Sequence, residues 1–191
     1  MGKNKVRVTK LPEERKQEII DVAMQVFTEK GYEQATMRDI AAAVGVVPGL
    51  CYRYFESKQE LFQMALQQYI SDYCAPIIQA IRKADSLDVI FAEAGELFIS
   101  RDGKEKYHQF FHADANKEFN ILLSNGICEY MTPYVAELAE RFKKDGNINI
   151  GDTVSFAQFI LYGQIPIIND ARLSSEEKVN RIKEYITKII R

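Results

Sequence analysis

The 191-residue chain has no tryptophan, two histidines and three cysteines. The cysteines, Cys51, Cys74 and Cys128, are odd in number and form no CxxC pair, which argues against a disulfide framework and fits a reducing compartment. The apolar stretch 159–168 is too short to cross a membrane and includes a glutamine and a proline, and no secretory signal is visible. We therefore expect a cytoplasmic protein with no membrane partner.

The chain also lacks the motifs on which an enzyme assignment would rest. It has no Ser-His-Asp or Cys-His-Asn motif, no phosphate-binding loop and no dinucleotide-binding glycine pattern. His108 and His112 share a helix face beside Glu105 and Asp114, a spacing that can bind a metal or respond to pH. Because no third ligand is predicted, we interpret them as polar groups at a helix edge and expect no metal, no cofactor and no enzymatic activity.

Charge is low overall but unevenly distributed. The formal net charge is −2, and hydrophobic residues make up 47% of the chain, enough for a substantial core in one or two small domains. The first 16 residues, however, contain six basic side chains and two acidic ones. Residues 1–10 lack an apolar period, so they are interpreted either as a basic arm that contacts DNA or as a solubilising tail.

Residues 36–61 carry two short helical patterns separated by a glycine. Thr36 and Asp39 have the spacing of a capping box, which predicts the start of a helix. Gly45 can take the left-handed conformation that ends this helix, and Pro48 suits the first turn of a second, short one. The tight turn between them predicts a helix-turn-helix, whose second helix enters the major groove of DNA.

The second short helix, expected to run to about Tyr54, carries groups suited to DNA. Little side-chain bulk at its start allows close approach to a groove or a phosphate. Its hydroxyls and guanidinium, and a lysine at the start of the next helix, are expected to position phosphates more than to read bases, although Tyr52 and Phe55 could also be ordinary core aromatics. The residues expected to contact DNA are Thr36, Arg38, Val47, Pro48, Gly49, Leu50, Tyr52, Arg53, Tyr54 and Lys58.

Helical periodicity continues through the remaining chain, which predicts an all-α fold with few strand signals. A first helix opens at Pro12 and closes at Gly31, and a Ser57 to Glu60 capping box starts a long helix. Pro76 is expected to kink or interrupt this long helix, as a packing adjustment or as part of a lever. Later helices are expected over residues 86–101, 104–113, 115–144, 152–169 and 174–190.

The segment 119–138 is apolar but contains Gly126 and Pro133, a combination that leaves space beside a helix. Aromatic residues accumulate in the same part of the chain. The alternative is that these side chains form ordinary core. The residues expected to line a ligand pocket are Phe91, Phe98, Phe110, Phe111, Leu123, Gly126, Ile127 and Tyr130.

The last two expected helices are unusually apolar. The penultimate one is apolar nearly all round, and the final one has a continuous apolar stripe after a Ser174 to Glu177 capping box. Burial on more than one side predicts a four-helix interface with a second copy, the alternative being burial within one chain. The residues expected at this interface are Phe156, Phe159, Ile160, Ile182, Ile186 and Ile189.

The first third of the chain carries a wider pattern of apolar, glycine and aromatic positions. Its residues are Ile20, Ala23, Phe27, Gly31, Tyr32, Thr36, Ile40, Ala41, Gly45, Val46, Gly49, Tyr52, Tyr54, Phe55, Lys58 and Leu61. At these spacings the chain resembles the tetracycline-repressor (TetR) family of regulators. Val47 and Pro48 depart from the commoner polar pair at the start of the family's recognition helix, and Cys51 replaces a more usual threonine or phenylalanine.

The resemblance implies an all-α homodimer with two domains. Residues 1–57 would form a basic arm and a three-helix DNA-binding domain, and residues 58–191 a helical effector-binding and dimerisation domain. It implies a transcription regulator, expected to be a repressor that a small, mostly apolar molecule releases from a palindromic double-stranded DNA operator. The alternative is a helical small-molecule-binding or metal-sensing protein without operator function, which salt-sensitive binding to duplex DNA distinguishes from a regulator.

Overall fold

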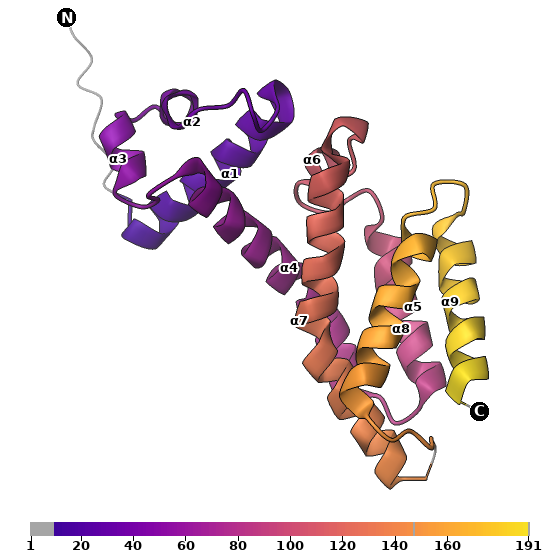
Figure 1. Ribbon diagram of the computed structural model, residues 1–191. Coiled ribbons are helices and arrows are strands. Elements are labelled where there is room, and N and C mark those ends of the chain that lie inside the picture. The colour runs from indigo at the N-terminus through magenta and orange to yellow at the C-terminus, as the bar shows by residue number, and fades with distance from the viewer. Residues whose placement is uncertain (1–9, 147, 191) are drawn as a thin grey trace, which may run out of the picture. The chain divides into compact units, whose positions relative to one another are not determined.

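The computed structural model describes residues 10–146 and 148–190, and the chain divides into two compact units, residues 1–66 and 67–191. Over the described residues the regular structure is helical throughout, which confirms the predicted all-α class (Figure 1). The helices are α1 (Pro12–Lys30), α2 (Met37–Val44), α3 (Pro48–Tyr52), α4 (Lys58–Lys83), α5 (Leu87–Arg101), α6 (His108–Phe111), the 3-10 turn η1 (Asp114–Asn116), α7 (Lys117–Lys144), α8 (Thr153–Ile168) and α9 (Ser175–Ile190).

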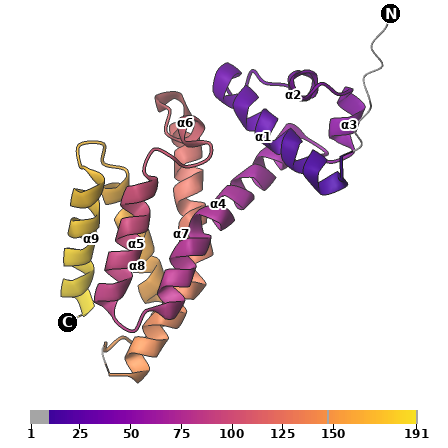
Figure 2. The ribbon, with the colours of Figure 1, turned by 180° about the vertical axis from the view of Figure 1, so that it is seen from behind.

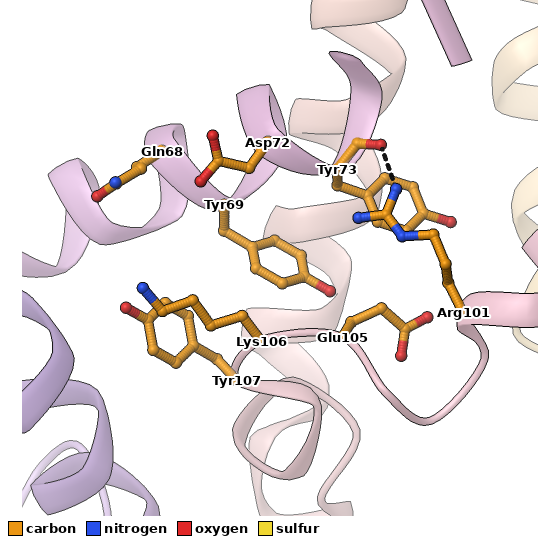
Figure 3. Close-up of a pocket in the computed structure, with 8 residues that line it drawn as sticks. All are labelled: Gln68, Tyr69, Asp72, Tyr73, Arg101, Glu105, Lys106 and Tyr107. Atoms are coloured by element: carbon orange, nitrogen blue, oxygen red, sulfur yellow. Dashed lines mark hydrogen bonds between the residues drawn. The ribbon is translucent and has the colours of Figure 1, made fainter. Parts of the chain in front are cut away.

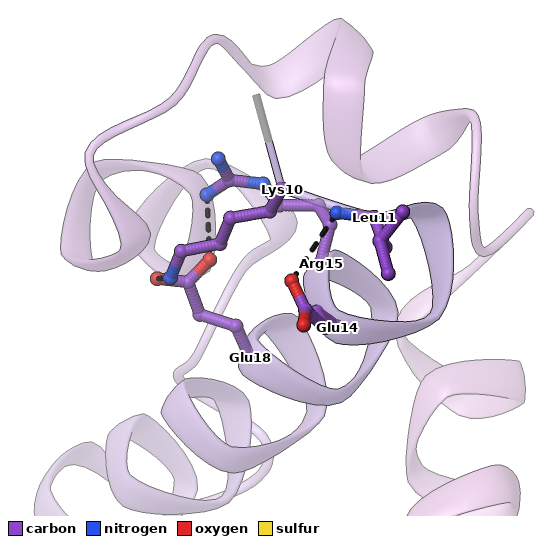
Figure 4. A network of polar contacts seen from close by, with 5 residues as sticks. All are labelled: Lys10, Leu11, Glu14, Arg15 and Glu18. Atoms are coloured by element: carbon purple, nitrogen blue, oxygen red, sulfur yellow. Dashed lines mark hydrogen bonds and ion pairs between the residues drawn. The ribbon is translucent and has the colours of Figure 1, made fainter. Parts of the chain in front are cut away.

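The start of α1 is fixed by local polar contacts, shown in Figure 4. The Leu11 backbone N–H donates to the Glu14 carboxylate at 3.2 Å. One turn later the Glu18 carboxylate accepts from Lys10 Nζ at 2.6 Å and from Arg15 Nη1 at 2.5 Å. These carboxylates lie near the positive end of the helix, where negative charge is favourable. The predicted basic arm, residues 1–10, lies outside the described residues except for Lys10.

The start of α2 confirms the predicted capping box. The Asp39 backbone N–H donates to the Thr36 hydroxyl, and the Thr36 backbone N–H donates to the Asp39 carboxylate at 2.9 Å. Lys30 donates to the other Asp39 oxygen at 2.6 Å. The hydrogen bond from Lys30, followed by those from Thr36, lowers the pKa of Asp39 to about 2. The carboxylate therefore stays charged and joins the end of α1 to the start of α2.

The core of the first unit includes the beginning of α4. The rings of Phe27, Tyr32 and Phe62 meet edge to face, with centroids 5.1 to 6.3 Å apart. Leu61 and Ala65 of α4 are fully buried. The first turns of α4 thus pack with α1, and the division between the two units lies inside α4, after Leu66.

Pro76 is expected from the sequence to kink or interrupt the long helix. α4 continues through Pro76, so the interruption does not occur. Its last carbonyls, which have no partner within the helix, accept from one guanidinium on α7. Arg141 donates to the carbonyl oxygens of Ile81 at 3.1 Å, Arg82 at 3.0 Å and Ala84 at 2.9 Å. This cap fastens the end of α4 to α7.

In the second unit, α5 lies beside α9 and α7 lies beside α8 (Figures 1 and 2). Two glycines allow close helix approach. A Cβ added to Gly95 of α5 would lie 2.8 Å from a methyl of Val179 on α9, and one added to Gly126 of α7 would lie 2.6 Å from Ile70 of α4. Gly126 therefore admits a neighbouring side chain and does not leave empty space. α7 also passes through Gly126 and Pro133 unbroken.

The expected helix over residues 104–113 is wrong for most of its length. Only α6, His108–Phe111, is helical there. Tyr107, just before it, has φ +64°, a left-handed conformation that few non-glycine residues adopt. After it, the Asn116 side chain donates to the Phe110 carbonyl at 2.8 Å and satisfies a group that a longer helix would use. The other expected helices after residue 85 agree within two residues at each end.

Replacing Arg141 with methionine should destabilise the second unit by roughly 2 kcal/mol, because several backbone carbonyls at the end of α4 lose a charged donor. Methionine retains an apolar stem of similar length. Urea unfolding followed by circular dichroism would measure the change. Arg172→Met is the matched control, since Arg172 is exposed and pairs with Asp170, two residues away. Equal unfolding midpoints for the two variants would refute the capping role of Arg141.

Candidate functional sites

The turn between α2 and α3 is tight and is fixed by backbone hydrogen bonds. Gly45 has φ +77° and ψ +34°, the left-handed conformation that the sequence predicts. Its N–H donates to the Ala42 carbonyl at 3.1 Å, and the Val46 N–H donates to the Ala41 carbonyl at 2.9 Å. Cys51, inside α3, is fully buried against this unit's core. The opposite side of α3 is therefore left facing outward.

The residues expected to contact DNA lie on or beside this outward face. Val47 is 71% exposed and Tyr52 is 53% exposed. A Cβ added to Gly49 would meet no atom within 4 Å, so the start of α3 has open space beside it and little side-chain bulk. Of the other expected residues, Thr36, Arg38, Pro48 and Arg53 are exposed, and Leu50, Tyr54 and Lys58 are half-buried. Helix α3 is slightly shorter than expected and ends at Tyr52.

Lys58 has a structural role that the sequence does not reveal. Its ammonium donates to the Tyr32 carbonyl at 2.6 Å and to the Glu33 carbonyl at 3.3 Å. The same ammonium lies 4.3 Å from the centre of the Tyr32 ring. Lys58 thus joins the start of α4 to the turn after α1. Partners 25 and 26 residues away cannot be found from helical spacing.

The second unit contains an apolar cavity of about 290 Å³. Side chains from α4, α5, α7, α8 and α9 line it, together with Ile148 from the loop before α8. None of these lining residues carries a charge, and the polar ones are Tyr73, Ser124, Cys128 and Gln164. Burial raises the pKa of the Cys128 thiol to about 11, so this group is also neutral near pH 7. The cavity can accept an apolar molecule but offers no counter-charge.

Only part of the expected pocket set lines this cavity. Phe91, Phe98 and Ile127 do. Gly126 faces Ile70, and Tyr130 is 38% exposed with its hydroxyl 3.3 Å from Ser71. Three further expected residues are buried elsewhere in the core: Phe110, Phe111 and Leu123. The rings of Phe110 and Phe111 belong to an aromatic cluster with Tyr69 and Phe119.

The residues expected at a dimer interface fall into two groups. Phe156, Ile160, Ile182 and Ile186 line the cavity. The remaining two, Phe159 on α8 and Ile189 on α9, are 67% and 50% exposed. The apolar residues of α8 and α9 therefore lie on two faces of each helix, one toward the cavity and one toward the surface.

Figure 3 shows a second, smaller recess of about 40 Å³, which is lined mostly by polar and charged residues. Tyr73 lines both this recess and the cavity. Arg101 donates to the Tyr73 carbonyl at 3.2 Å, and its guanidinium lies 5.2 Å from the Tyr73 ring centre. Burial, with a smaller effect of Glu105, raises the pKa of Tyr73 to about 12. Tyr73 is therefore a neutral group shared by the apolar cavity and a recess that Asp72 and Glu105 also line.

The two histidines stack, with ring centroids 4.3 Å apart. Glu105 Oε2 lies 3.0 Å from His108 Nδ1. Burial and the neighbouring His108 lower the pKa of His112. Within residues 10–146 and 148–190, no group of three or more His, Cys, Asp or Glu side chains is arranged to hold a metal ion.

The region containing the helix-turn-helix matches known proteins. A family model described as "Bacterial regulatory proteins, tetR family" matches residues 19–65. The transcriptional activator FasR of Mycolicibacterium smegmatis is 35% identical over 77 residues, 40% of this chain and 35% of that protein. The fatty acid metabolism regulator protein of Bacillus subtilis is 24% identical over 88% of this chain and 92% of that protein. Residues 19–65 are therefore similar to the TetR family of bacterial regulatory proteins.

Solved structures with the TetR fold cover nearly the whole chain. The fatty acid degradation regulator FadR from Bacillus halodurans has a TM-score of 0.67 at 21% identity, over 93% of this chain and 96% of that one. A TetR-family regulator from Mesorhizobium loti has a TM-score of 0.69 at 22% identity, over 94% and 96%. At such identities the likeness establishes the fold alone.

Matches to several TetR relatives are local. Across four of them this chain covers 28% to 58% of the relative's own length. These relatives are transcriptional regulators and not enzymes. Over the described residues, no helix has the length and apolar character that crossing a membrane requires.

Proposed function

We propose that this chain is a cytoplasmic, homodimeric transcription regulator of the TetR family that binds a palindromic DNA operator and is released from it by a small, mostly apolar effector. The observation that carries this proposal is the helix-turn-helix with an outward α3 face, inside the segment that the family model matches. A repressor is the simplest form of such a switch, because an effector that frees the DNA then restores transcription.

The exposed groups of α3 support DNA binding by contact with phosphates. Tyr52 and Arg53 lie at the end of the helix, and both are exposed. Arg38 on α2 is exposed as well. Guanidinium and hydroxyl donors of this kind position a protein on the duplex, whatever the base sequence.

Selection of bound duplexes from a random pool tests this function directly. A two-fold symmetric dimer should recover a palindrome with half-sites roughly ten base pairs apart, or a multiple of one helical turn. Arg53→Gln should then weaken binding to all duplexes alike and reduce the salt dependence by about one unit of slope per half-site. Arg181→Gln, an exposed arginine on α9, is the control. An unchanged slope for Arg53→Gln would remove this residue from the interface, and selection of no preferred duplex would refute the proposed function.

The cavity supports an apolar effector. An apolar molecule in this cavity of about 290 Å³ would pack against the lining side chains and bury its apolar surface. Such a molecule binds without needing a charged group. The Bacillus subtilis relative and the Bacillus halodurans structure are named for fatty acid metabolism and degradation. A ligand with an acyl chain fits a cavity with no charged side chain in its lining.

Ala94→Phe should fill the cavity from α5, because Ala94 lines it. We expect uptake of a neutral fluorescent probe, N-phenyl-1-naphthylamine, to weaken about tenfold or more, a loss of roughly 1.4 kcal/mol. We also expect effector-driven release from DNA to be lost, or the variant to be released constitutively while still folded. Ala92→Phe adds the same ring at an exposed position of α5 and should behave as the parent protein. Normal probe uptake by Ala94→Phe would place the effector elsewhere.

The outer face of α8 supports dimerisation. Val154, Phe159 and Tyr162 are exposed, from 37% to 67%, and Phe159 and Tyr162, three residues apart, lie on one face of the helix. On the same helix, a Cβ added to Gly163 would meet no atom within 4 Å, so a second helix has room to approach closely. An exposed apolar patch of this kind is typical of a protein interface. Ile189 and Tyr185 of α9, each 50% exposed, extend the apolar surface.

Phe159→Lys should convert the dimer to a monomer, because a charge would have to be buried at the centre of this face. Sedimentation velocity over a range of concentrations would measure the change. Ile121→Lys is the matched control, since Ile121 on α7 is also an exposed apolar residue, at 58%. If Ile121→Lys dissociated the protein and Phe159→Lys did not, the interface would lie on α7.

A further inference from the structure

Val47 is the most exposed of the large hydrophobic side chains in the described part of the chain, at 71%. It is the residue immediately before α3, with an extended backbone at φ −74° and ψ +145°. Its carbonyl accepts from the Leu50 N–H at 2.9 Å, but its side chain makes no capping hydrogen bond. The valine side chain therefore contributes neither to the core nor to the start of the helix.

Three other helices of this chain hold a capping residue at this position, whereas α1 has the exposed Leu11 there. The residues before α2, α5 and α8 are Thr36, Ser86 and Asp152, and each side chain accepts from a backbone N–H of its helix. Ser, Thr, Asn and Asp are strongly preferred at such positions, and valine is disfavoured. An exposed valine there lowers helix stability with no compensating contact within its own unit. A contact with another molecule would compensate for this loss.

The side chains that follow Val47 limit the kinds of contact that the start of α3 can make with another molecule. Pro48 and Gly49 are exposed and have no side-chain hydrogen-bonding group, and Leu50 is half-buried. The start of α3 consequently cannot identify a base by side-chain hydrogen bonds. In the major groove, the feature that an apolar side chain can recognise is the 5-methyl group of thymine.

We propose that Val47 reads a thymine 5-methyl group in each half-site of the operator. The proposal depends on the proposed DNA-binding function, in which the first residues of the second helix face base edges. It identifies Val47 as a specificity-determining residue, whereas Arg53 and Tyr52 contribute affinity independent of sequence. The half-site therefore contains a T·A pair at the position that Val47 faces.

Deoxyuridine substitution tests this contact, because deoxyuridine lacks the methyl group and keeps the base pairing of thymine. Each thymine of the selected duplex is replaced in turn, symmetrically in both half-sites, and affinity is measured by fluorescence anisotropy at fixed salt. At one position the wild-type protein should bind about fourfold more weakly per half-site, the factor expected for one methyl-sized group. Substitution at the other thymines should change affinity less.

Two variants assign the effect to Val47. Val47→Ser removes both methyl groups and supplies a preferred capping residue, so α3 should remain at least as stable. This variant should bind the thymine and deoxyuridine duplexes equally, with the affinity that the wild type has for the deoxyuridine duplex. Val47→Thr retains one methyl group and the side-chain shape, and it should still prefer thymine. Thermal unfolding of all three proteins verifies that the comparison is between folded molecules.

The outcomes separate this proposal from the function on which it depends. If the wild type selects a duplex but tolerates deoxyuridine at every thymine, the methyl contact is refuted and DNA recognition stands. If Val47→Ser keeps the wild-type preference for thymine, another residue reads the methyl group and the proposal is likewise overturned. If the wild type selects no duplex at all, the proposed DNA-binding function itself fails.

Discussion

Helix α4 is held at both ends by a cation that binds backbone carbonyls. At its start, Lys58 donates to the carbonyls of Tyr32 and Glu33, and near its end Arg141 of α7 donates to carbonyls of residues 81, 82 and 84. Charged donors on partly buried carbonyls are among the stronger hydrogen bonds in a protein. One continuous helix thus begins in the first unit and ends in the second, and within the second unit it contributes Tyr73, Ile77 and Ile81 to the cavity.

In our proposal, this arrangement gives an effector a physical means of action. A molecule can shift an equilibrium only by the difference in its affinity for the two states. Moving a protein from almost fully bound to almost fully free requires roughly 5 kcal/mol of such difference. In our proposal the cavity supplies this difference, because a molecule inside it buries apolar surface against the lining. Pro76 lies between the cavity-lining Tyr73 and Ile77, where one backbone hydrogen bond of α4 is missing.

The sequence predicts well those features whose causes are local. The capping box of Thr36 and Asp39, the left-handed Gly45 and the start of α4 all depend on residues within four positions of each other. The helix expected over 104–113 fails because the Asn116 side chain competes for the Phe110 carbonyl and Tyr107 adopts a positive φ. Amino-acid composition predicts neither the hydrogen bond of Asn116 nor the positive φ of Tyr107. The role of Lys58 at the turn after α1 is a long-range contact and is equally invisible to periodicity.

The candidate ligand-binding residues are harder to predict, since an apolar residue in a helix pattern does not say what covers it. Gly126 is read from sequence as space beside α7, but the space is taken by Ile70. Phe156 and Ile160 are read as dimer contacts, but they lie on the cavity side of α8. Both differences from the expected positions have the same cause. Helical spacing separates a buried face from an exposed one, whereas the choice between core, cavity and partner depends on which helices pack together.

The two sides of α8 connect the effector to the partner subunit in our proposal. Ile160 faces the cavity and the adjacent Phe159 faces outward at 67% exposure. A helix transmits a shift of one side chain to its neighbours, because close-packed side chains move as a unit. An effector that moves Ile160 therefore also moves the surface on which a second copy would pack. The spacing of two DNA-binding units on a palindrome depends on that surface, so filling the cavity can change the fit to both half-sites at once.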